Sequence, residues 1–202
     1  MVRYIFIFVA CIAFAKPWVL VGYPEFIEKH QIEHCRSLEN PYDCFLSVQG
    51  IASVNFYKNE MFVTHYELIA RVPIAKIGDD YIDAKGVIFH INEMPQHASL
   101  PVLNMSHDNV PKAVKIIQLI RRLKFPKVIS IVVGSSDQWR IWLSNGNELR
   151  MGSRPLQILP RAAAFIGGNK LLFKKGNMYF DFRNSHQVAI AQLNKLEANR
   201  YE

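Results

Sequence analysis

Residues 109–124 have the most regular pattern of apolar and polar positions in the chain. The apolar residues recur every three to four positions, which is the spacing of one face of an α-helix. The basic residues fall mostly off this stripe, so the pattern predicts an amphipathic helix with a solvated basic face. The stripe consists of Val110, Val114, Ile117, Ile120 and Leu123, and the basic residues are Lys112, Lys115, Arg121, Arg122 and Lys124.

Short apolar runs bounded by turn-forming residues predict strands in much of the remaining chain. They cover residues 18–22, 51–57, 62–72, 128–133, 139–143, 149–151, 178–182 and 187–191, and two more short strands fall within 80–91. Asn145-Gly146 is a strong signal for a two-residue hairpin turn. Three more helices are expected, over residues 24–38, 41–48 and 155–166, and Gly167-Gly168 should stop the last of them.

The order of these elements predicts a mixed α+β fold. The first part of the chain runs strand, helix, helix, strand, strand, and the part after it consists mainly of antiparallel strands with two helices among them. The last residues, 193–202, are polar and predict a frayed tail.

The amino terminus sets the expected compartment. Tyr4–Ala15 is a run of twelve apolar residues, a length more typical of a signal peptide than of a membrane-spanning helix. Ala13-Phe14-Ala15 also fits the cleavage pattern of a signal peptide. An anchor from Tyr4 to Tyr23, with Lys16 near one end, and a buried core helix are the alternatives. Both the signal peptide and the membrane anchor would place the rest of the chain outside the cytoplasm.

Composition excludes several classes of protein. The chain has 202 residues, half of them hydrophobic and 20% charged, which excludes a disordered or low-complexity chain.

The net charge is +7 and is unevenly distributed: residues 1–108 carry 8 basic and 12 acidic side chains, and residues 109–202 carry 16 basic and 5 acidic side chains. Such an excess suits nucleic acid, an anionic membrane or an acidic partner. A location outside the cytoplasm argues against nucleic acid as the ligand. The simplest interpretation of the basic residues is a solvated helix face.

Two cysteines and two histidines gather between residues 30 and 44. His30 and His34 have the helical spacing of a metal-binding pair. With so few ligands we expect instead that His34 is solvated and that His30 is packed. Cys35 and Cys44 lie nine residues apart and, outside the reducing cytoplasm, are expected to form a disulfide worth about 2–3 kcal/mol. Two reduced buried thiols are the alternative.

No catalytic signature stands out in the sequence. Asp79, Asp80 and Asp83 cluster near a turn, where Asp is common because its side chain hydrogen-bonds the local backbone. Motifs for serine hydrolases, phosphate-binding loops and zinc proteases are absent from the sequence. We therefore predict a protein that is not an enzyme, with no metal, cofactor or small-molecule substrate.

Four blocks, in order, resemble the FtsQ/DivIB family of bacterial cell-division proteins. They are VPIAKIGDDYIDAKGVIF at 72–89, LPVL at 100–103, WRIWLSNGNELRMG at 139–152 and YFDFR at 179–183. The resemblance implies a membrane anchor or signal segment at 1–16, a POTRA-like domain at 17–75, a β domain at 76–192 and a tail at 193–202. Departures from the family pattern include Asn184, where an aromatic residue is common, and Gln187.

The resemblance also implies partners. Members recruit other division proteins at the septum, and their last strands bind the FtsB/FtsL coiled coil, partly by strand addition. It therefore implies a single-pass protein of the inner membrane with its bulk in the periplasm. The partner-binding residues carried over by position are Tyr179, Phe180, Asp181, Phe182, Arg183, Gln187, Val188, Ala189 and Ile190. In the last strand, we expect Val188 and Ile190 to face the core and Gln187 and Ala189 to face outward.

The main alternative is a secreted or periplasmic binding protein with a cleaved signal peptide and no division role. A hydrolase with an unrecognised site is a third possibility.

Overall fold

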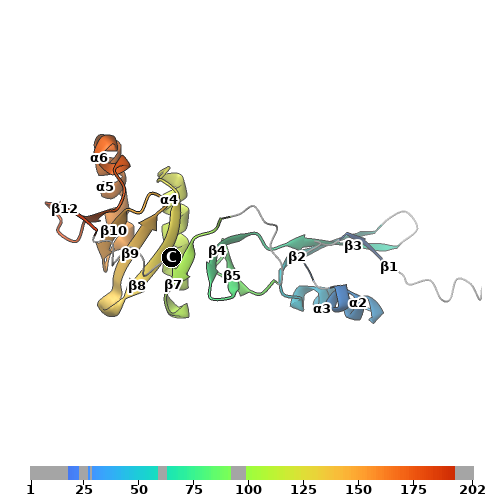
Figure 1. The fold of residues 1–202 in the computed structure, drawn as a ribbon. Coiled ribbons are helices and arrows are strands. Elements are labelled where there is room, and N and C mark those ends of the chain that lie inside the picture. Colours follow the sequence, from blue (N-terminus) through green and yellow to red (C-terminus); the bar gives the residue numbers. More distant parts are fainter. Residues whose placement is uncertain (1–17, 23–26, 28, 59–62, 92–98, 194–202) are drawn as a thin grey trace, which may run out of the picture. The chain divides into compact units, whose positions relative to one another are not determined.

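The computed structural model describes residues 18–22, 27, 29–58, 63–91 and 99–193 (Figure 1). They form a mixed α+β fold with one small sheet, one large sheet and few helices, which confirms the predicted fold class. The chain forms two compact units. The first unit contains the residues up to Arg71 together with 90–95, and the second unit contains Val72–Phe89 and the residues from 96 onward.

The first unit has the expected order strand, helix, helix, strand, strand. Its elements are β1 (Trp18–Gly22), α2 (Lys29–Ser37), α3 (Tyr42–Ser47), β2 (Ile51–Lys58) and β3 (Thr64–Ala70). The central strand, β3, pairs with β1 in parallel and with β2 antiparallel. The two strand runs predicted around residue 60 therefore do form an antiparallel pair, and their connection at 59–62 lies outside the described residues.

An aromatic cluster forms the centre of the first unit's core. Trp18 from β1 meets Phe45 from α3 and Tyr66 from β3 edge to face, with ring centroids about 6 Å apart. Ile32 and Cys35 are the buried residues of α2, so the helix buries only one narrow stripe. The small size of this core makes every additional constraint on the chain valuable.

The second unit contains a nine-stranded sheet in the order β12-β11-β10-β9-β8-β7-β4-β5-β6. The pairs β11–β10, β8–β7 and β7–β4 are parallel and the others antiparallel, so the sheet is mostly antiparallel as expected. Its strands are β4 (Pro73–Ile77), β5 (Asp80–Asp83), β6 (Ile88–Phe89), β7 (Val102–Asn104), β8 (Val128–Gly134), β9 (Gln138–Leu143), β10 (Glu148–Gly152), β11 (Met178–Asp181) and β12 (Ala189–Gln192).

Three helices pack against one face of this sheet. They are α4 (Val110–Arg122), α5 (Pro155–Gly168) and α6 (Lys170–Lys174). Strand registers place Ile131, Ile141, Leu149 and Phe180 in one row across the sheet, and all four are fully buried in the same core as the apolar residues of the helices. The alternate residues of these strands form the opposite face of the sheet.

The structure corrects several details of the sequence analysis. Helix α5 continues through Gly167 and Gly168 instead of stopping before them, because neither glycine adopts a positive φ. Strands β4 and β7 and helix α6 were not predicted as separate elements, so the described part of the second unit has three α-helices where two were expected. Leu193, assigned to the polar tail, is buried, and its backbone N–H donates to the Asn177 carbonyl at 2.8 Å. His30 is exposed instead of packed.

The amino-terminal segment expected to reach the membrane, residues 1–16, lies outside the described residues, as do residues 194–202. Among the helices that the structure describes, none combines the length and the apolar character needed to cross a bilayer.

Candidate functional site

The predicted partner-binding residues come together at one end of the large sheet. Strand β11 lies between β10 and β12, and β12 is the last strand in the order. The antiparallel register pairs Tyr179 with Ala191 and Asp181 with Ala189. Residues 182–188 connect the two strands, so the two predicted segments form one continuous edge structure.

The buried turn residue Asn147 holds β11 beside β10. Its side-chain amide donates to the Phe173 carbonyl of α6 at 2.8 Å, and its side-chain oxygen accepts the N–H of Met178 at 3.0 Å. Asn145, at the start of the same turn, also donates to the Phe173 carbonyl, at 2.9 Å. The turn was predictable from the Asn-Gly pair, but the positioning role of Asn147 was not, because its only sequence signal is a second Asn beside that pair.

The helix-covered face of β11 anchors the edge in the core. Phe180 and Phe182 are fully buried. Phe165 from α5 packs against both of their rings, and Phe173 from α6 packs against Phe180 with centroids 5.2 Å apart. These two predicted contact residues are therefore inaccessible to a partner, and they act by fixing the strand that a partner would approach.

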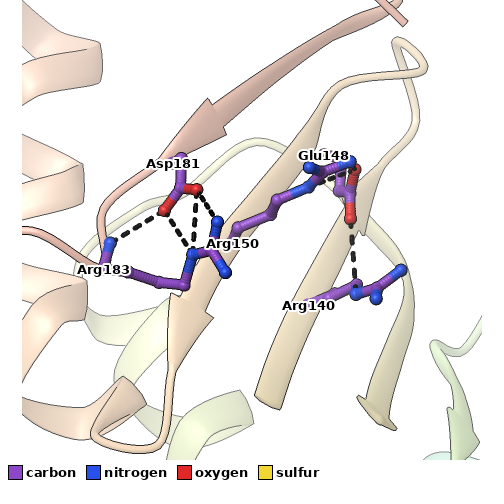
Figure 2. Close-up of polar contacts among 5 residues, drawn as sticks. All are labelled: Arg140, Glu148, Arg150, Asp181 and Arg183. Carbon is purple, nitrogen blue, oxygen red and sulfur yellow. Dashed lines mark hydrogen bonds and ion pairs between the residues drawn. The ribbon is translucent and has the colours of Figure 1, made fainter. Parts of the chain in front are cut away.

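The opposite face of the same strands is charged. Asp181 accepts hydrogen bonds from the side chain and the backbone N–H of Arg183 (Figure 2). Burial acts to raise the pKa of Asp181, but these bonds and the charges of Arg183 and Arg150 outweigh it and hold the pKa below its ordinary value. The same hydrogen bond raises the pKa of Arg183. Arg183 itself is exposed, so its guanidinium faces solvent beside the edge strand.

A second carboxylate lies between two arginines on this face. Glu148 is 1% exposed and pairs with Arg150 at 2.9 Å and with Arg140 at 3.8 Å (Figure 2). The Arg150 guanidinium also lies 4.1 Å from the ring centroid of Tyr179, so this cation–π contact connects β10 to β11. The three arginines outnumber the two carboxylates, which leaves this face basic.

The connection between β11 and β12 is fixed by Arg161 of α5. Its guanidinium donates to the carbonyl of Asn184 at 2.7 Å and to the carbonyl of Gln187 at 2.8 Å. The Asn184 side chain caps the turn by accepting the N–H of His186 at 2.9 Å. Asn184 and Gln187, which depart from the family pattern, are thus held through their backbones. The role of Arg161 was not predicted, and the sequence signal that could have revealed it is a single charged residue within an apolar helix.

The outer side of β12 is free of any other strand in the described part of the chain. The N–H of Leu193 donates inward to β11, and hydrogen-bonding direction alternates along an antiparallel strand. The N–H groups of Ala189 and Ala191 therefore point toward β11, and those of Ile190 and Gln192 point outward. A cavity of about 480 Å³ adjoins the start of β12, lined by Asp181, Arg183, Asn184, Gln187, Val188 and Ala189.

The expected burial of β12 is wrong in one respect. Ile190 was predicted to face the core, but it is 38% exposed, while Val188 is half-buried. Ile190 is paired with the buried Phe180, so it lies on the correct face, but it has a neighbouring strand on one side only. An edge strand with an exposed isoleucine and outward N–H groups is suited to strand addition.

The cysteine pair lies in the first unit. A disulfide joins Cys35 of α2 to Cys44 of α3, with Cα atoms 5.4 Å apart. His30 and His34 are both exposed on α2, and Cys35 is committed to the disulfide. Over the ranges that the structure describes, no cluster of three or more His, Cys, Asp or Glu side chains is placed to hold a metal.

The three clustered aspartates lie at the two ends of β5: Asp79 precedes the strand, and Asp80 and Asp83 are its first and last residues. Asp83 is buried, and one of its side-chain oxygens accepts the backbone N–H groups of Lys85 and Val87 at 2.8 and 3.0 Å. This is the local hydrogen bonding that the sequence analysis expected of Asp in a turn.

Comparison with protein-family models gives a match that covers most of the second unit. The family model described as "Cell division protein FtsQ/DivIB, C-terminal" matches residues 70–183, more than half of the chain and nearly all of the second unit up to Arg183. No curated protein matches the chain.

Proposed function

Because the chain belongs to the FtsQ/DivIB family of cell-division proteins, we propose that it is a scaffold that recruits other division proteins to the septum. The family is non-enzymatic and acts at the septal membrane. In this proposal residues 1–16 anchor the chain, residues 17–75 form a POTRA-like domain and residues 76–192 form the β domain. Both domains lie on the periplasmic side, where they contact other division proteins.

The observation that carries the proposal is the outer edge of β12. None of the described strands pairs with its outward N–H and C=O groups, and a partner strand can satisfy them with hydrogen bonds worth about 0.5–1.5 kcal/mol each. Arg183 and the cavity beside Val188 and Ala189 lie next to that edge. The proposed partner is an FtsB/FtsL-type coiled coil whose following segment adds a strand to β12.

Replacing a single residue of β12 tests this proposal. Ile190→Pro removes an outward N–H and keeps the inward ladder, and proline is tolerated on edge strands whose N–H faces solvent. We expect this variant to stay folded and to lose capture of the coiled-coil partner. Ile190→Ala keeps the N–H and should retain most of the binding. Ala189→Pro would instead remove the hydrogen bond from the Ala189 N–H to β11. That variant therefore tests whether the edge strand stays folded, and not whether its outer side can bind a partner.

The matched controls decide how the result is interpreted. Lys115→Ala, on the exposed face of α4, should leave capture unchanged because one exposed charge contributes only about 0–1 kcal/mol. Circular dichroism must show that each variant is folded. Wild-type capture by a folded Ile190→Pro variant would place the interface elsewhere.

Two measurements test the location. A functional fluorescent fusion should concentrate at midcell in dividing cells, and a uniform distribution would contradict the proposal. Intact-mass measurement of the mature protein separates a retained anchor from a cleaved signal peptide. Cleavage after Ala15, which the Ala13-Phe14-Ala15 pattern would permit, would favour the alternative of a secreted or periplasmic binding protein.

A further inference from the structure

A second surface of the large unit, away from the outer edge of β12, has the features of a docking site. A pocket of about 340 Å³ opens between the end of α4 and the α5–α6 pair. Leu123, Phe125, Ile166 and Phe173 supply most of its apolar lining. Phe173 forms a firm floor because it is buried and packs against Phe180 of β11.

The rim of this pocket is basic. Lys124, Lys170 and Lys174 line it and are exposed, and within the described part of the chain none of the three has a carboxylate ion-pair partner. Lys170 and Lys174 lie four residues apart on α6, where like charges repel and weaken a helix. An acidic occupant would relieve this repulsion, so the charge pattern is complementary to carboxylates and not to cations.

The apolar contact extends beyond the pocket. Leu171 of α6 exposes 83% of its surface, the largest exposed fraction among the large apolar residues that the structure describes. It lies three residues before Lys174 and therefore on a neighbouring part of the same helical surface. An exposed leucine beside an apolar pocket with a lysine rim suits an amphipathic ligand that carries negative charge.

Gly167 leaves the pocket open. It lies within α5 without a positive φ, and a Cβ built on it would meet nothing within 4 Å. Packing therefore does not require glycine there, although glycine weakens a helix relative to residues with a side chain. A leucine at this position would project into the pocket. Gly168 has equally free space around its Cβ but does not line the pocket, so it provides a matched control.

From this geometry we propose that the pocket binds an acidic amphipathic segment of a partner protein, which inserts a leucine or phenylalanine side chain and places carboxylates against the three lysines. The volume is at the small end of ligand sites and fits one or two apolar side chains, the anchor pattern by which helices dock in grooves. This site is independent of strand addition at β12.

A synthetic peptide tests the proposal without knowledge of the natural partner. The probe is a fluorescein-labelled amphipathic helix of about 16 residues, with leucines on one face and glutamates on the other. The fluorescence anisotropy of the peptide is measured as the full chain, held in phosphatidylcholine nanodiscs, is added. Empty nanodiscs serve as the blank. We expect saturable binding that weakens with salt. The same peptide with lysines in place of the glutamates should not bind.

Paired variants locate the binding. Gly167→Leu should weaken probe binding by about tenfold or more, and Gly168→Leu should leave it within about twofold of wild type. Lys170→Glu/Lys174→Glu should weaken binding by at least about tenfold, and Lys115→Glu should have little effect. Both leucine variants should fold, because leucine favours helix over glycine.

Three results would overturn the proposal. They are absence of probe binding to the wild-type chain, equal binding by wild type and Gly167→Leu, and equal weakening by the two leucine variants. Binding of soluble dihexanoyl-phosphatidylglycerol, abolished by Gly167→Leu while the peptide does not bind, would assign the pocket to an anionic lipid instead. None of these results depends on whether β12 captures a coiled coil.

Discussion

The two units differ in the size of their hydrophobic cores and in the strand edges and charged faces that they can leave exposed. Among the described residues, the first unit buries 10 apolar side chains in its core and the second buries 22. The first unit has a disulfide between its two helices, whereas residues 72–202 contain no cysteine. The larger core of the second unit can support a strand with a free edge and a charged sheet face. A small core has less free energy to spare for such features.

The largest expected effect compares two phenylalanines, one from each unit. Phe180 is fully buried in the core of the second unit, while Phe56 is 61% exposed on the first. Phe180→Ala should lower the free energy of unfolding of the second unit by about 3–5 kcal/mol, because it leaves a cavity among packed rings. Phe56→Ala should cost about 1 kcal/mol or less. Urea denaturation followed by segment-resolved hydrogen exchange measures both, and equal costs would contradict this account of the cores.

The next effect concerns the disulfide. Cys35→Ala/Cys44→Ala should destabilise the first unit by about 2–3 kcal/mol, because the unfolded chain gains freedom. The second unit should be unchanged, since its core contains neither cysteine. Hydrogen exchange read separately in residues 29–58 and 128–152 tests this comparison. Under denaturing, non-reducing conditions, thiol labelling of the wild type should leave both cysteines unmodified, and full labelling would remove the basis of the prediction.

A smaller effect is expected at the turn that positions β11. Asn147→Ala removes one of the two side-chain donors to the Phe173 carbonyl and the side-chain acceptor of the Met178 N–H in a buried place, and should cost about 1–3 kcal/mol. Asn184→Ala is the matched control, because its side chain is exposed and caps only a local turn. Thermal denaturation by circular dichroism compares the two. A larger loss in Asn184→Ala would mean that the connection, and not the turn, holds the edge in place.

The smallest effect is a dependence on pH. The pKa of Asp181 is lower in the folded protein than its ordinary value of 3.8. The bond to Arg183 therefore stabilises the second unit fully above that value, and its contribution is lost as the pH falls through the folded-state pKa. Melting temperatures measured between about pH 5 and pH 2.5 should fall less steeply in Asp181→Asn than in wild type. Identical slopes would show that Asp181 titrates normally.

Local signals predicted most of the fold, and long-range contacts decided the rest. Asn145-Gly146 could be recognised as a hairpin turn because its conformation depends on its own backbone, and Gly146 does adopt a positive φ. The predicted two-residue length is wrong, because Leu143 and Asn147 close a loop of three residues and Asn145 has no positive φ. Gly167-Gly168 failed as a stop signal because a helix tolerates glycine when its neighbours continue the pattern. Strand β4 begins at a proline and is only five residues long, so it depends on the pairing with β5 that no local pattern reveals.

The candidate site was predictable in position but not in detail. The alternation in residues 187–191 suggested a strand, and the resemblance suggested that it binds a partner. The exposure of Ile190 depends on β12 being the last strand of the sheet, and that order is a property of the whole unit. The outward direction of its N–H follows from the register with β11, which a single sequence cannot supply. Arg161 reaches the connection from a helix more than twenty residues away.

The central claim is that the free outer edge of β12 takes up a partner strand, and amide hydrogen exchange tests it residue by residue. The register places the N–H groups of Ile190 and Gln192 outward and those of Ala189 and Ala191 against β11. On addition of the coiled-coil partner, exchange at Ile190 and Gln192 should slow by at least about tenfold, while Ala191, already bonded, changes little. Tight binding of the partner with unchanged exchange at Ile190 and Gln192 would contradict the account.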